Sequence, residues 1–360
     1  MNHLSMERIL ERIEQSEQFD EMRITRDQVH EMFREHLLFS YTPEIGQLIN
    51  QVHDALIQRT VLLAEQLLED EGYGKPPVAY AFVLLGSGGR REQTLWSDQD
   101  NGLIYEESES HTQEQLDAYF DRLASYILRG LDILGYPPCE GNVISSNPQW
   151  RKSLTSYTDM MMGWFLEPDW ENVRYLLIMA DMRCMYGSNE LVIKLKQAFL
   201  AYVHENPSVL KYLLSNTLHH KISLGIFGHL ITERYGEDAG GVDIKYGAYI
   251  PIVNGIRLLA IQAGIQATST VERIQQLRMN AVVSEQLAAD WEWSFAVALR
   301  LRDMTPFQLE DEKYTTRGKL TAEQLTKETR AALKQCLRTG MELQKYVSKS
   351  IESHIEREKG

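Results

Sequence analysis

The chain has 360 residues and a net charge of -14 at pH 7, and 43% of its residues are apolar. This length suits two or three domains, each with its own core. The negative charge opposes binding to a phosphate backbone, so we expect no long nucleic acid as a partner. No apolar run approaches the roughly 18 residues of a membrane span, and the N-terminus lacks the apolar core of a secretory signal. We therefore expect a cytoplasmic protein without a membrane partner.

The first segment of the chain has a helical pattern. Thr42 fits an N-cap with Pro43 at the first helical position, and the apolar residues that follow share one face as far as Gly72. The paired prolines of "GKPPV" cannot continue a helix. We therefore predict an N-terminal helical segment over residues 1–75.

The residue pattern that follows predicts a small α/β domain over residues 76–150. The β-branched and aromatic run at 78–85 predicts a buried strand, and a second strand is expected at 99–105. Leucines and aromatic residues at spacings of three and four predict an amphipathic helix over 116–134. The sequence "GNVIS" at 141–145 then predicts a third short strand.

From residue 151 to 360 the pattern is helical almost without interruption, and we predict a helical domain there. Two capping boxes, Ser269 with Glu272 and Thr321 with Gln324, predict helix starts. An apolar stripe at helical spacing is expected to belong to the core and not to a cofactor site. The stripe consists of Leu287, Trp291, Phe295 and Leu299.

The cysteines indicate no disulfide framework. Cys139, Cys184 and Cys336 are scattered and odd in number, which also argues against a thiolate metal site. We expect all three to be small buried apolar residues.

The stretch "LLGSGGRREQTLWSDQDNGLIYE" at 84–106 places a glycine-rich turn after the first predicted strand. Such a turn is typical of phosphate binding, because glycine lets the backbone approach the ligand closely. Gly86 and Ser87 begin the turn, and Arg90 and Arg91 add positive charge. The spacing matches neither a P-loop nor a dinucleotide fingerprint, so the turn taken alone is better explained as a plain tight turn.

Two aspartates follow the turn. Asp98 and Asp100 are two residues apart, so in a strand both carboxylates project from one face and need a cation between them. Hard oxygen ligands suit Mg²⁺ or Mn²⁺. The structural alternative is an Asp-rich turn in which these side chains cap backbone groups. With a short helix between the glycines and the acids, the combination favours a site for a metal-bound nucleoside triphosphate.

This order of features resembles the signature of the DNA polymerase β-like nucleotidyltransferase superfamily, which consists of an apolar strand that ends in Gly-Ser, a gap of about ten residues, and Asp-x-Asp. The longer stretch "GSGGRREQTLWSDQDNGLIY" is similar to a family of nucleotidyltransferases that is often linked to cyclic-nucleotide-binding and CBS domains. That family is similar in turn to the uridylyltransferase of the nitrogen-regulatory signal protein and to glutamine synthetase adenylyltransferase. The resemblance continues through "PPCEGNVISSNPQW" and covers most of the chain after about residue 40, without a visible cyclic-nucleotide-binding or CBS segment.

The resemblance implies an α+β fold that is mostly helical. A small polymerase β-like domain with a short mixed sheet would lie between the N-terminal helical segment and a C-terminal helical bundle that binds the substrate. The resemblance assigns Gly86, Ser87 and the basic residue Arg90 to the phosphate-binding turn. It assigns Asp98 and Asp100 as the catalytic carboxylates that bind the metal.

Two positions depart from the superfamily pattern. Gln99 stands between the carboxylates where an apolar residue is usual. A third carboxylate is expected on a later strand, as base or metal ligand, and Glu140 is the candidate. Glu92 and Gln93 match the signature of the closer family but receive no role from it.

The stretch "DIKYGAYIPIVNGIR" resembles a region with Lys, Gly and Arg in the helical part of the two nitrogen-regulation transferases. Lys245 and Arg257 could contact the triphosphate or the acceptor. Equally, Arg257 could pair with a nearby acid such as Asp243 and hold helices together. Three histidines without a matching carboxylate or cysteine pattern are expected to be ordinary surface or core residues: His219, His220 and His229.

The leading hypothesis is a Mg²⁺-dependent nucleotidyltransferase. It would move a nucleoside monophosphate from ATP or UTP to a hydroxyl of a protein or small-molecule acceptor and release pyrophosphate. The alternative is a nucleotide-binding signalling protein that lacks a competent base. A purely structural helical scaffold, which would bind no triphosphate, is the third hypothesis. The sequence does not indicate the nucleobase of the triphosphate, the acceptor or the oligomeric state.

Overall fold

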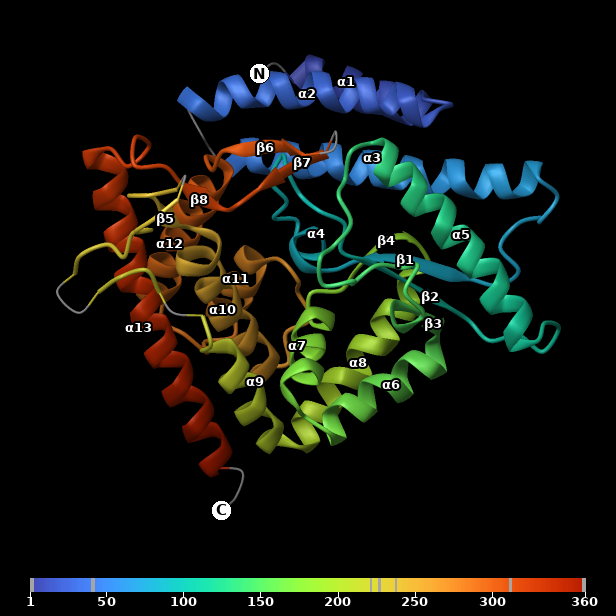
Figure 1. Ribbon diagram of the computed structural model, residues 1–360. Helices are drawn as coiled ribbons and strands as arrows, with labels where there is room; N and C mark the ends of the chain where they lie inside the picture. The colour runs from blue at the N-terminus through green and yellow to red at the C-terminus, as the bar shows by residue number, and fades with distance from the viewer. Residues whose placement is uncertain are drawn as a thin grey trace. The chain divides into compact units, whose positions relative to one another are not determined.

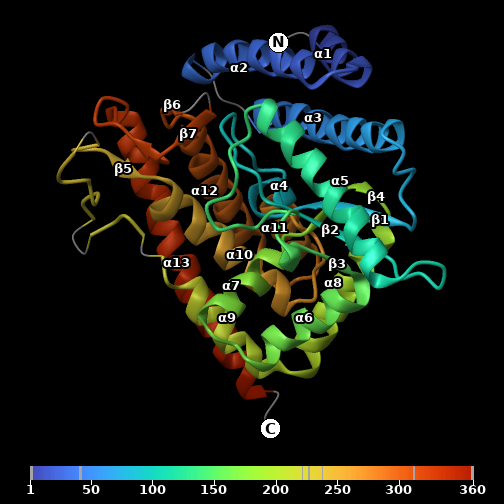
Figure 2. The same ribbon diagram turned by 45° about the vertical axis from the view of Figure 1, so that its right-hand side comes forward.

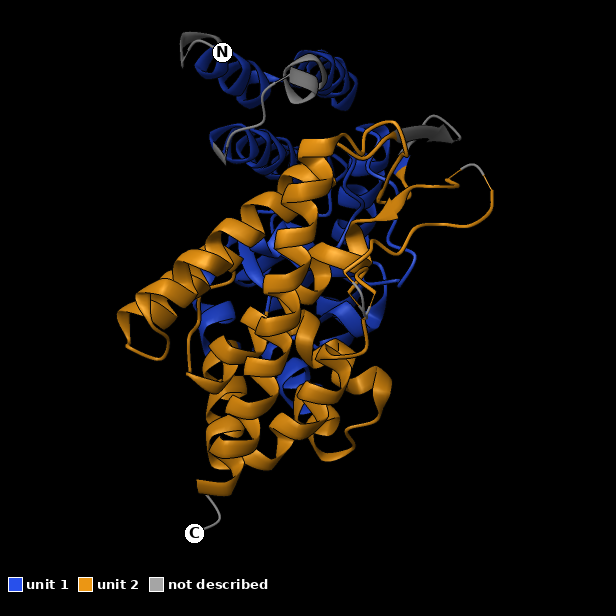
Figure 3. Ribbon diagram, turned by 90° about the vertical axis from the view of Figure 1, so that its left-hand side faces the viewer, with its two compact units in different colours: residues 1–160, 181–195, 308–315 blue, residues 161–180, 196–307, 316–360 orange. Residues whose placement is uncertain are grey.

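The chain forms two compact units, each discontinuous in sequence (Figure 3). The N-terminal unit comprises residues 1–160, 181–195 and 308–315, and the C-terminal unit comprises residues 161–180, 196–307 and 316–360. The structure is a computed structural model that describes residues 3–39, 43–220, 222–225, 228–236, 238–310 and 313–357. The predicted N-cap, Thr42, lies outside these residues.

Three helices begin the N-terminal unit, within the segment that the sequence predicts to be helical. They are α1 (His3–Gln15), α2 (Phe19–Phe39) and α3 (Pro43–Asp70), and both α1 and α2 pack on α3 (Figure 1). Most of the predicted apolar face of α3 is buried, including Val52 and Leu56. The long α3 therefore forms one wall of the unit.

A four-stranded mixed sheet forms the centre of the N-terminal unit. Its order is β3 (Arg151–Ser153), β2 (Asn101–Tyr105), β1 (Tyr80–Leu84) and β4 (Arg183–Gly187). Strand β1 is antiparallel to both β2 and β4, whereas β3 is parallel to β2. Every residue of β1 and β2 is buried, which confirms both predicted strands.

Two features of the sheet differ from the sequence prediction. The predicted strand at 141–145 is wrong: these residues form turns and irregular backbone, although the N–H of Asn101 donates to the carbonyl of Val143 at 3.0 Å. The strand beside β2 is instead β3. Strand β4 was not predicted, because its residues are only half-buried at the sheet edge and lack a continuous apolar run.

Helix α5 (Gln113–Ile133) confirms the predicted amphipathic helix and lies beside α3 (Figure 1 and Figure 2). Thr112 caps it, because its hydroxyl accepts from the N–H of Gln115 and the Gln115 side chain accepts from the N–H of Thr112 at 2.9 Å. On the inner face, the ring of Phe120 stacks on Tyr105 of β2. The helix thus covers the sheet at the strand that follows the two aspartates.

The C-terminal unit is mainly helical. Helix α10 (Ile250–Gln262) packs on α11 (Thr270–Met279) and α13 (Lys327–Arg357), and α12 (Glu285–Asp303) packs on α11 and α13. Trp291 and Phe295 are buried, as the predicted stripe requires. The further elements of the chain, in either unit, are α6 (Leu154–Leu166), α7 (Trp170–Met179), α8 (Asn189–Glu205), α9 (Leu210–Thr217), β5 (Val242–Asp243), η3 (Lys245–Tyr249), β6 (Phe307–Glu310), β7 (Lys313–Thr316), β8 (Lys319–Leu320) and two short turns, η1 (Pro148–Trp150) and η2 (Pro207–Val209).

One of the two predicted capping boxes marks a helix start. Ser269 caps α11 by accepting from the N–H of Glu272 at 3.1 Å. Thr321 and Gln324 do exchange both hydrogen bonds, but they form a turn, and α13 begins only at Lys327.

The architecture is α+β and mostly helical, with a small mixed sheet, which confirms the predicted fold class. Among the helices of the described ranges, none is long and apolar enough to cross a membrane.

Candidate active site

The glycine-rich turn is a short helix, α4 (Gly86–Arg90), directly after β1. Gly86 has a φ of 51°, and a Cβ at this position would overlap the carboxylate of Asp100. A Cβ at Gly89 would overlap the backbone oxygen of Asp181, which precedes β4. Both glycines are therefore required by the close approach of other segments.

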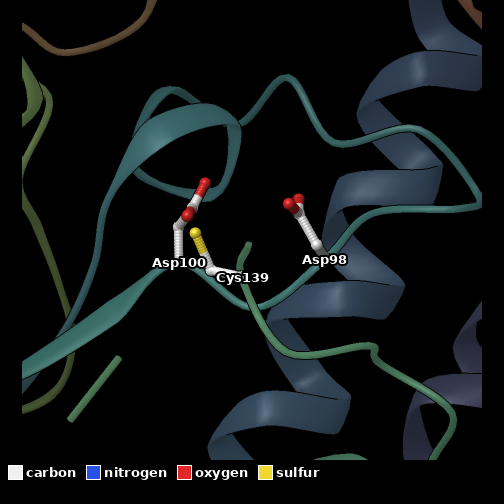
Figure 4. A group of neighbouring side chains, drawn as sticks. All are labelled: Asp98, Asp100 and Cys139. Carbon is white, nitrogen blue, oxygen red and sulfur yellow. The ribbon is translucent and has the colours of Figure 1, made fainter. Parts of the chain in front are cut away.

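Extended backbone before β2 places the two aspartates. Gln99 pairs with Pro138 in an isolated bridge, and its N–H donates to the carbonyl of Pro137 at 2.9 Å. In extended backbone, side chains alternate. The buried Gln99 side chain donates to the carbonyl of Tyr136 at 2.9 Å, whereas the carboxylates of Asp98 and Asp100 point toward a common space (Figure 4). The turn is tied to these acids because the N–H of Leu85 donates to the carbonyl of Asp100 at 3.0 Å.

Cys139 joins the two aspartates. One carboxylate oxygen from each of Asp98 and Asp100 and the sulfur of Cys139 all lie within 4.8 Å of one another. Burial, followed by the charge of Asp100, raises the pKa of the Cys139 thiol to about 12. Cys336 is buried as expected, but Cys139 is half-buried and belongs to a polar group, so the expectation of an ordinary apolar residue is wrong for it.

Buried amides lie close to the acids. The Oε1 atoms of Gln93 and Gln99 and the Nδ2 atom of Asn101 have no hydrogen-bond partner among the described residues. All three residues line a small pocket together with Asp98 and Asp100. Buried polar groups are normally satisfied by protein, water or ligand. The two converging carboxylates fit a hydrated Mg²⁺ or Mn²⁺, which keeps several of its waters.

Arg90 lies inside the protein. Its Nε donates to Glu92 at 2.7 Å and its Nη1 to Asp181 at 2.5 Å, and these three side chains are at most 4% exposed. The N–H of Glu92 also donates to the carbonyl of Ser87 at 2.9 Å. The arrangement links the turn to the start of β4. Glu92, for which the sequence predicts no role, is thus one partner of Arg90.

A second arginine, not singled out in the sequence, supports the turn from β4. Arg183 donates through Nη2 to the carbonyl of Gly88 at 2.9 Å and to Asp54 of α3 at 2.7 Å. Arg91 is 3.6 Å from the same carboxylate, and its side chain is 54% exposed. Arg183 could have been found only by predicting β4, since nothing in its local sequence indicates a contact with the turn.

The segment after the turn is anchored on α3. The N–H of Gln93 donates to Asn50 at 2.9 Å, and Asn50 donates to the carbonyl of Gln93 at 3.1 Å. Nε2 of His53 lies 3.0 Å from the carbonyl of Thr94, so it donates, and Nδ1 accepts from the hydroxyl of Tyr136 at 2.6 Å. This neutral histidine holds the segment that leads to Gln99 and the segment around Tyr136 that pairs with it.

Burial, followed by the charge of Arg26, lowers the pKa of His53 to about 3. Below pH 6.5 the unfolded imidazole binds a proton that the folded one does not, so stability falls as the pH falls toward 3. Between pH 6.5 and 5.5 this amounts to about 1 kcal/mol, because the unfolded imidazole is already half protonated at pH 6.5. In urea unfolding at these two pH values, we expect His53→Gln to lose about 1 kcal/mol less than the wild type. His204→Gln, at an exposed position, should lose as much as the wild type. Equal losses in all three proteins would contradict this.

The remaining predicted residues lie outside the group of Asp98, Asp100 and Cys139, or in the other unit. Glu140 is exposed in a turn and is not a member of the group of Asp98, Asp100 and Cys139. Strand β3, the neighbour of β2, carries no acidic residue. The role of Glu140 as a third carboxylate stays a prediction.

Lys245 and Arg257 lie on consecutive elements of the C-terminal unit. Lys245 begins η3, a π-helical turn, with its ammonium 5.3 Å from the centre of the Tyr246 ring. Arg257 is buried in α10. Asp243, considered as a partner for Arg257, accepts from the N–H of Tyr246 at 2.8 Å. Their substrate contacts stay predictions.

The histidines of the C-terminal unit pack against aromatic rings. His219 lies against Trp170, and His220 stacks on Tyr246 at 5.1 Å between ring centres. In the part of the chain that the structure describes, neither they nor His229 belong to a group that could hold a metal ion.

Gly86→Ala should destabilise the protein by about 1–2 kcal/mol from the left-handed backbone alone, and it should also displace Asp100. We expect Mn²⁺ affinity to fall at least about tenfold, as it does when groups that orient a metal ligand are lost. Gly74→Ala is the matched control, because Gly74 has a φ of 75° and its added Cβ would meet nothing within 4 Å. Urea unfolding and Mn²⁺ calorimetry measure both effects. Unchanged Mn²⁺ affinity in Gly86→Ala would show that the turn does not position the acid.

A small mixed sheet with a glycine-rich turn beside paired aspartates is the arrangement that the resemblance to nucleotidyltransferases implied. Residues 25–171 match the family described as "Putative nucleotidyltransferase DUF294", and residues 207–351 match its "Putative nucleotidyltransferase substrate binding domain". Together the two matches cover most of the chain, which therefore belongs to this nucleotidyltransferase family. Among curated proteins, none matches the chain.

Proposed function

We propose that the protein transfers a nucleoside monophosphate from ATP or UTP to a hydroxyl of a protein or small-molecule acceptor and releases pyrophosphate. The observation that carries the proposal is the convergence of Asp98 and Asp100 beside the Gly86 turn, in a chain of a nucleotidyltransferase family. In the reaction, the acceptor oxygen bonds to the α-phosphorus as the bond from that phosphorus to the bridging oxygen breaks. The hydroxyl proton leaves to a base.

The residues of the N-terminal unit would divide the work as follows. Asp98 and Asp100 hold the divalent cation, Mg²⁺ or Mn²⁺, which when bound neutralises phosphate charge and lowers the pKa of the acceptor hydroxyl. The backbone of Gly86 and the hydroxyl of Ser87 hold the phosphates of the leaving group. Arg91, whose side chain is exposed beside the turn, supplies positive charge to them.

Arg90 receives a positioning role in this proposal. Its guanidinium is occupied by two buried carboxylates, Glu92 and Asp181, so it holds the turn in place from within. The C-terminal unit, which matches a substrate-binding domain, would bind the acceptor, with Lys245 and Arg257 as the candidate contacts.

A second function, a nucleotide-binding signalling protein without transfer activity, is favoured by one observation. Among the described residues, the group around Asp98 contains no third carboxylate, because Glu140 lies outside it. Without a base, the site would bind a triphosphate and leave it unchanged.

Two measurements test the function. In a thermal-shift screen of the four ribonucleoside triphosphates, binding to the folded state raises the melting temperature, and we expect the rise to require Mg²⁺ or Mn²⁺. Labelled triphosphates are then incubated with the protein and a cell extract. Label transferred to an acceptor supports the enzyme, whereas binding without transfer rejects it in favour of the signalling protein. No binding of any triphosphate would reject both.

A further inference from the structure

We propose that Cys139 is a third ligand of the cation held by Asp98 and Asp100, and that the site consequently binds a thiophilic divalent ion, of the class of Zn²⁺, more tightly than Mg²⁺. The inference depends on the proposed function only in using the two aspartates as metal ligands.

The geometry suits one shared ion. The three ligand atoms lie within 4.8 Å of one another, and the sulfur and both carboxylates point to the same side of the chain (Figure 4). Zinc binds sulfur at about 2.3 Å and carboxylate oxygen at about 2.0–2.2 Å. In tetrahedral coordination such a sulfur and oxygen would be roughly 3.6 Å apart, so side-chain rotations of about 1 Å bring all three atoms into reach of one ion.

The backbone that places Cys139 also places the acids. Its neighbour Pro138 forms the bridge with Gln99, the residue between the two aspartates. On the other side, the carbonyl of Cys139 accepts from the N–H of Asn142 at 3.0 Å and closes a tight turn. Main-chain contacts therefore hold the backbone of Cys139 in place beside both aspartates.

Two independent observations indicate that this region is built for a ligand. The side chain of Gln93 is 5% exposed, and its Oε1 atom has no partner among the described residues, yet it lines the same small pocket as Asp98 and Asp100. Because Gly86 has no Cβ, it leaves the space that the Asp100 carboxylate occupies; a Cβ at this position would overlap the carboxylate. Gln93 thus leaves a buried acceptor in a pocket that the two aspartates also line, and Gly86 keeps the Asp100 carboxylate in its place.

The donor set determines which ion is preferred. Mg²⁺ takes oxygen ligands and water, so the thiol contributes little to its binding. Thiolate ligands select zinc and other softer ions. When the sulfur–metal bond forms, the S–H proton leaves to solvent. Zinc would thus compete with magnesium for the two aspartates, and it would inhibit an enzyme that needs the waters of a magnesium ion.

Cadmium is a spectroscopic probe for this ligand set, since a cadmium–thiolate bond has an ultraviolet charge-transfer band. On titrating the full chain with Cd²⁺ alone, we expect this band to saturate at about one equivalent. It should vanish in Cys139→Ser and in Cys139→Ala. Cys184→Ser is the matched control and should keep the band, because Cys184 is also half-buried in the N-terminal unit but lies outside the group of ligands.

Calorimetry gives a second readout. Cys139→Ser should bind Zn²⁺ at least about tenfold more weakly, while its Mg²⁺ affinity changes less than about threefold. Matching melting curves show that the variants are folded. A cadmium band that persists in Cys139→Ser, or an unchanged Zn²⁺ affinity, overturns the proposal. Absence of nucleotide transfer in a protein with a normal cadmium band would reject the proposed function and leave this inference standing.

Discussion

Replacing Asp100 with asparagine is expected to lower nucleotide transfer by about 1,000-fold or more, a loss of roughly 4 kcal/mol of transition-state stabilisation. The amide keeps the shape of the side chain but removes the charge that holds the cation. The folded protein should be as stable as the wild type or more stable, because two carboxylates that lie within 4.8 Å of one another repel when no cation separates them. Transfer of labelled nucleotide and thermal melting measure the two effects together.

Asp159→Asn is the control for this variant. Asp159 is exposed on α6 and lies outside the metal-ligand group, so both transfer and melting should stay unchanged. If Asp100→Asn transfers nucleotide at the wild-type rate, the aspartates do not hold a catalytic cation. A lower melting temperature in Asp100→Asn would instead assign this side chain a structural role.

Replacing Arg90 with methionine is expected to destabilise the protein by about 3–5 kcal/mol. The substitution removes the guanidinium that pairs with both Glu92 and Asp181, two carboxylates almost without solvent contact. Buried carboxylates that lose a charged partner are costly, because burial has already removed the hydration that would otherwise stabilise them. Urea unfolding at neutral pH measures the loss.

The neighbouring residue provides the matched control. Arg91→Met removes an equal charge from a side chain that is 54% exposed and lies 3.6 Å from Asp54, so the cost should stay below about 1 kcal/mol. Arg90→Lys keeps the charge but not the planar fork, and its stability should fall between the two. Equal unfolding midpoints for Arg90→Met and Arg91→Met would refute the structural role. A stable Arg90→Met protein that no longer binds triphosphate would restore the nucleotide contact that the sequence resemblance implies.

The parts of the fold that could be predicted from sequence are those whose signal is local. The strands β1 and β2 are short, buried apolar runs, and α5 has an apolar stripe with clear ends. The pairing of Asp98 with Asp100 also follows from a local rule, the alternation of side chains in extended backbone. It holds although both residues precede β2, because the bridge of Gln99 with Pro138 keeps this segment extended.

The parts that could not be predicted depend on contacts between distant segments. Arg90 stands where a phosphate contact is expected, and only its pairing with Asp181, 91 residues later, shows that it faces the interior. Cys139 looks like an ordinary core residue until the turn after Pro138 brings it to the aspartates. Strand β4 is a half-buried edge strand without a strong pattern, so Arg183 and its bond to the turn were missed with it.

The late position of β4 has a consequence for how the protein is made. Strand β1 obtains its second neighbour only from β4, and the glycine-rich turn is closed by the backbone of Asp181 and by Arg183. While the ribosome is still translating, β1 has emerged but one of its edges is unpaired, and such an edge recruits other chains. A shortened version for expression therefore has to continue past Gly187, since one that stops at the end of β3 would lack the strand that shields β1 from self-association.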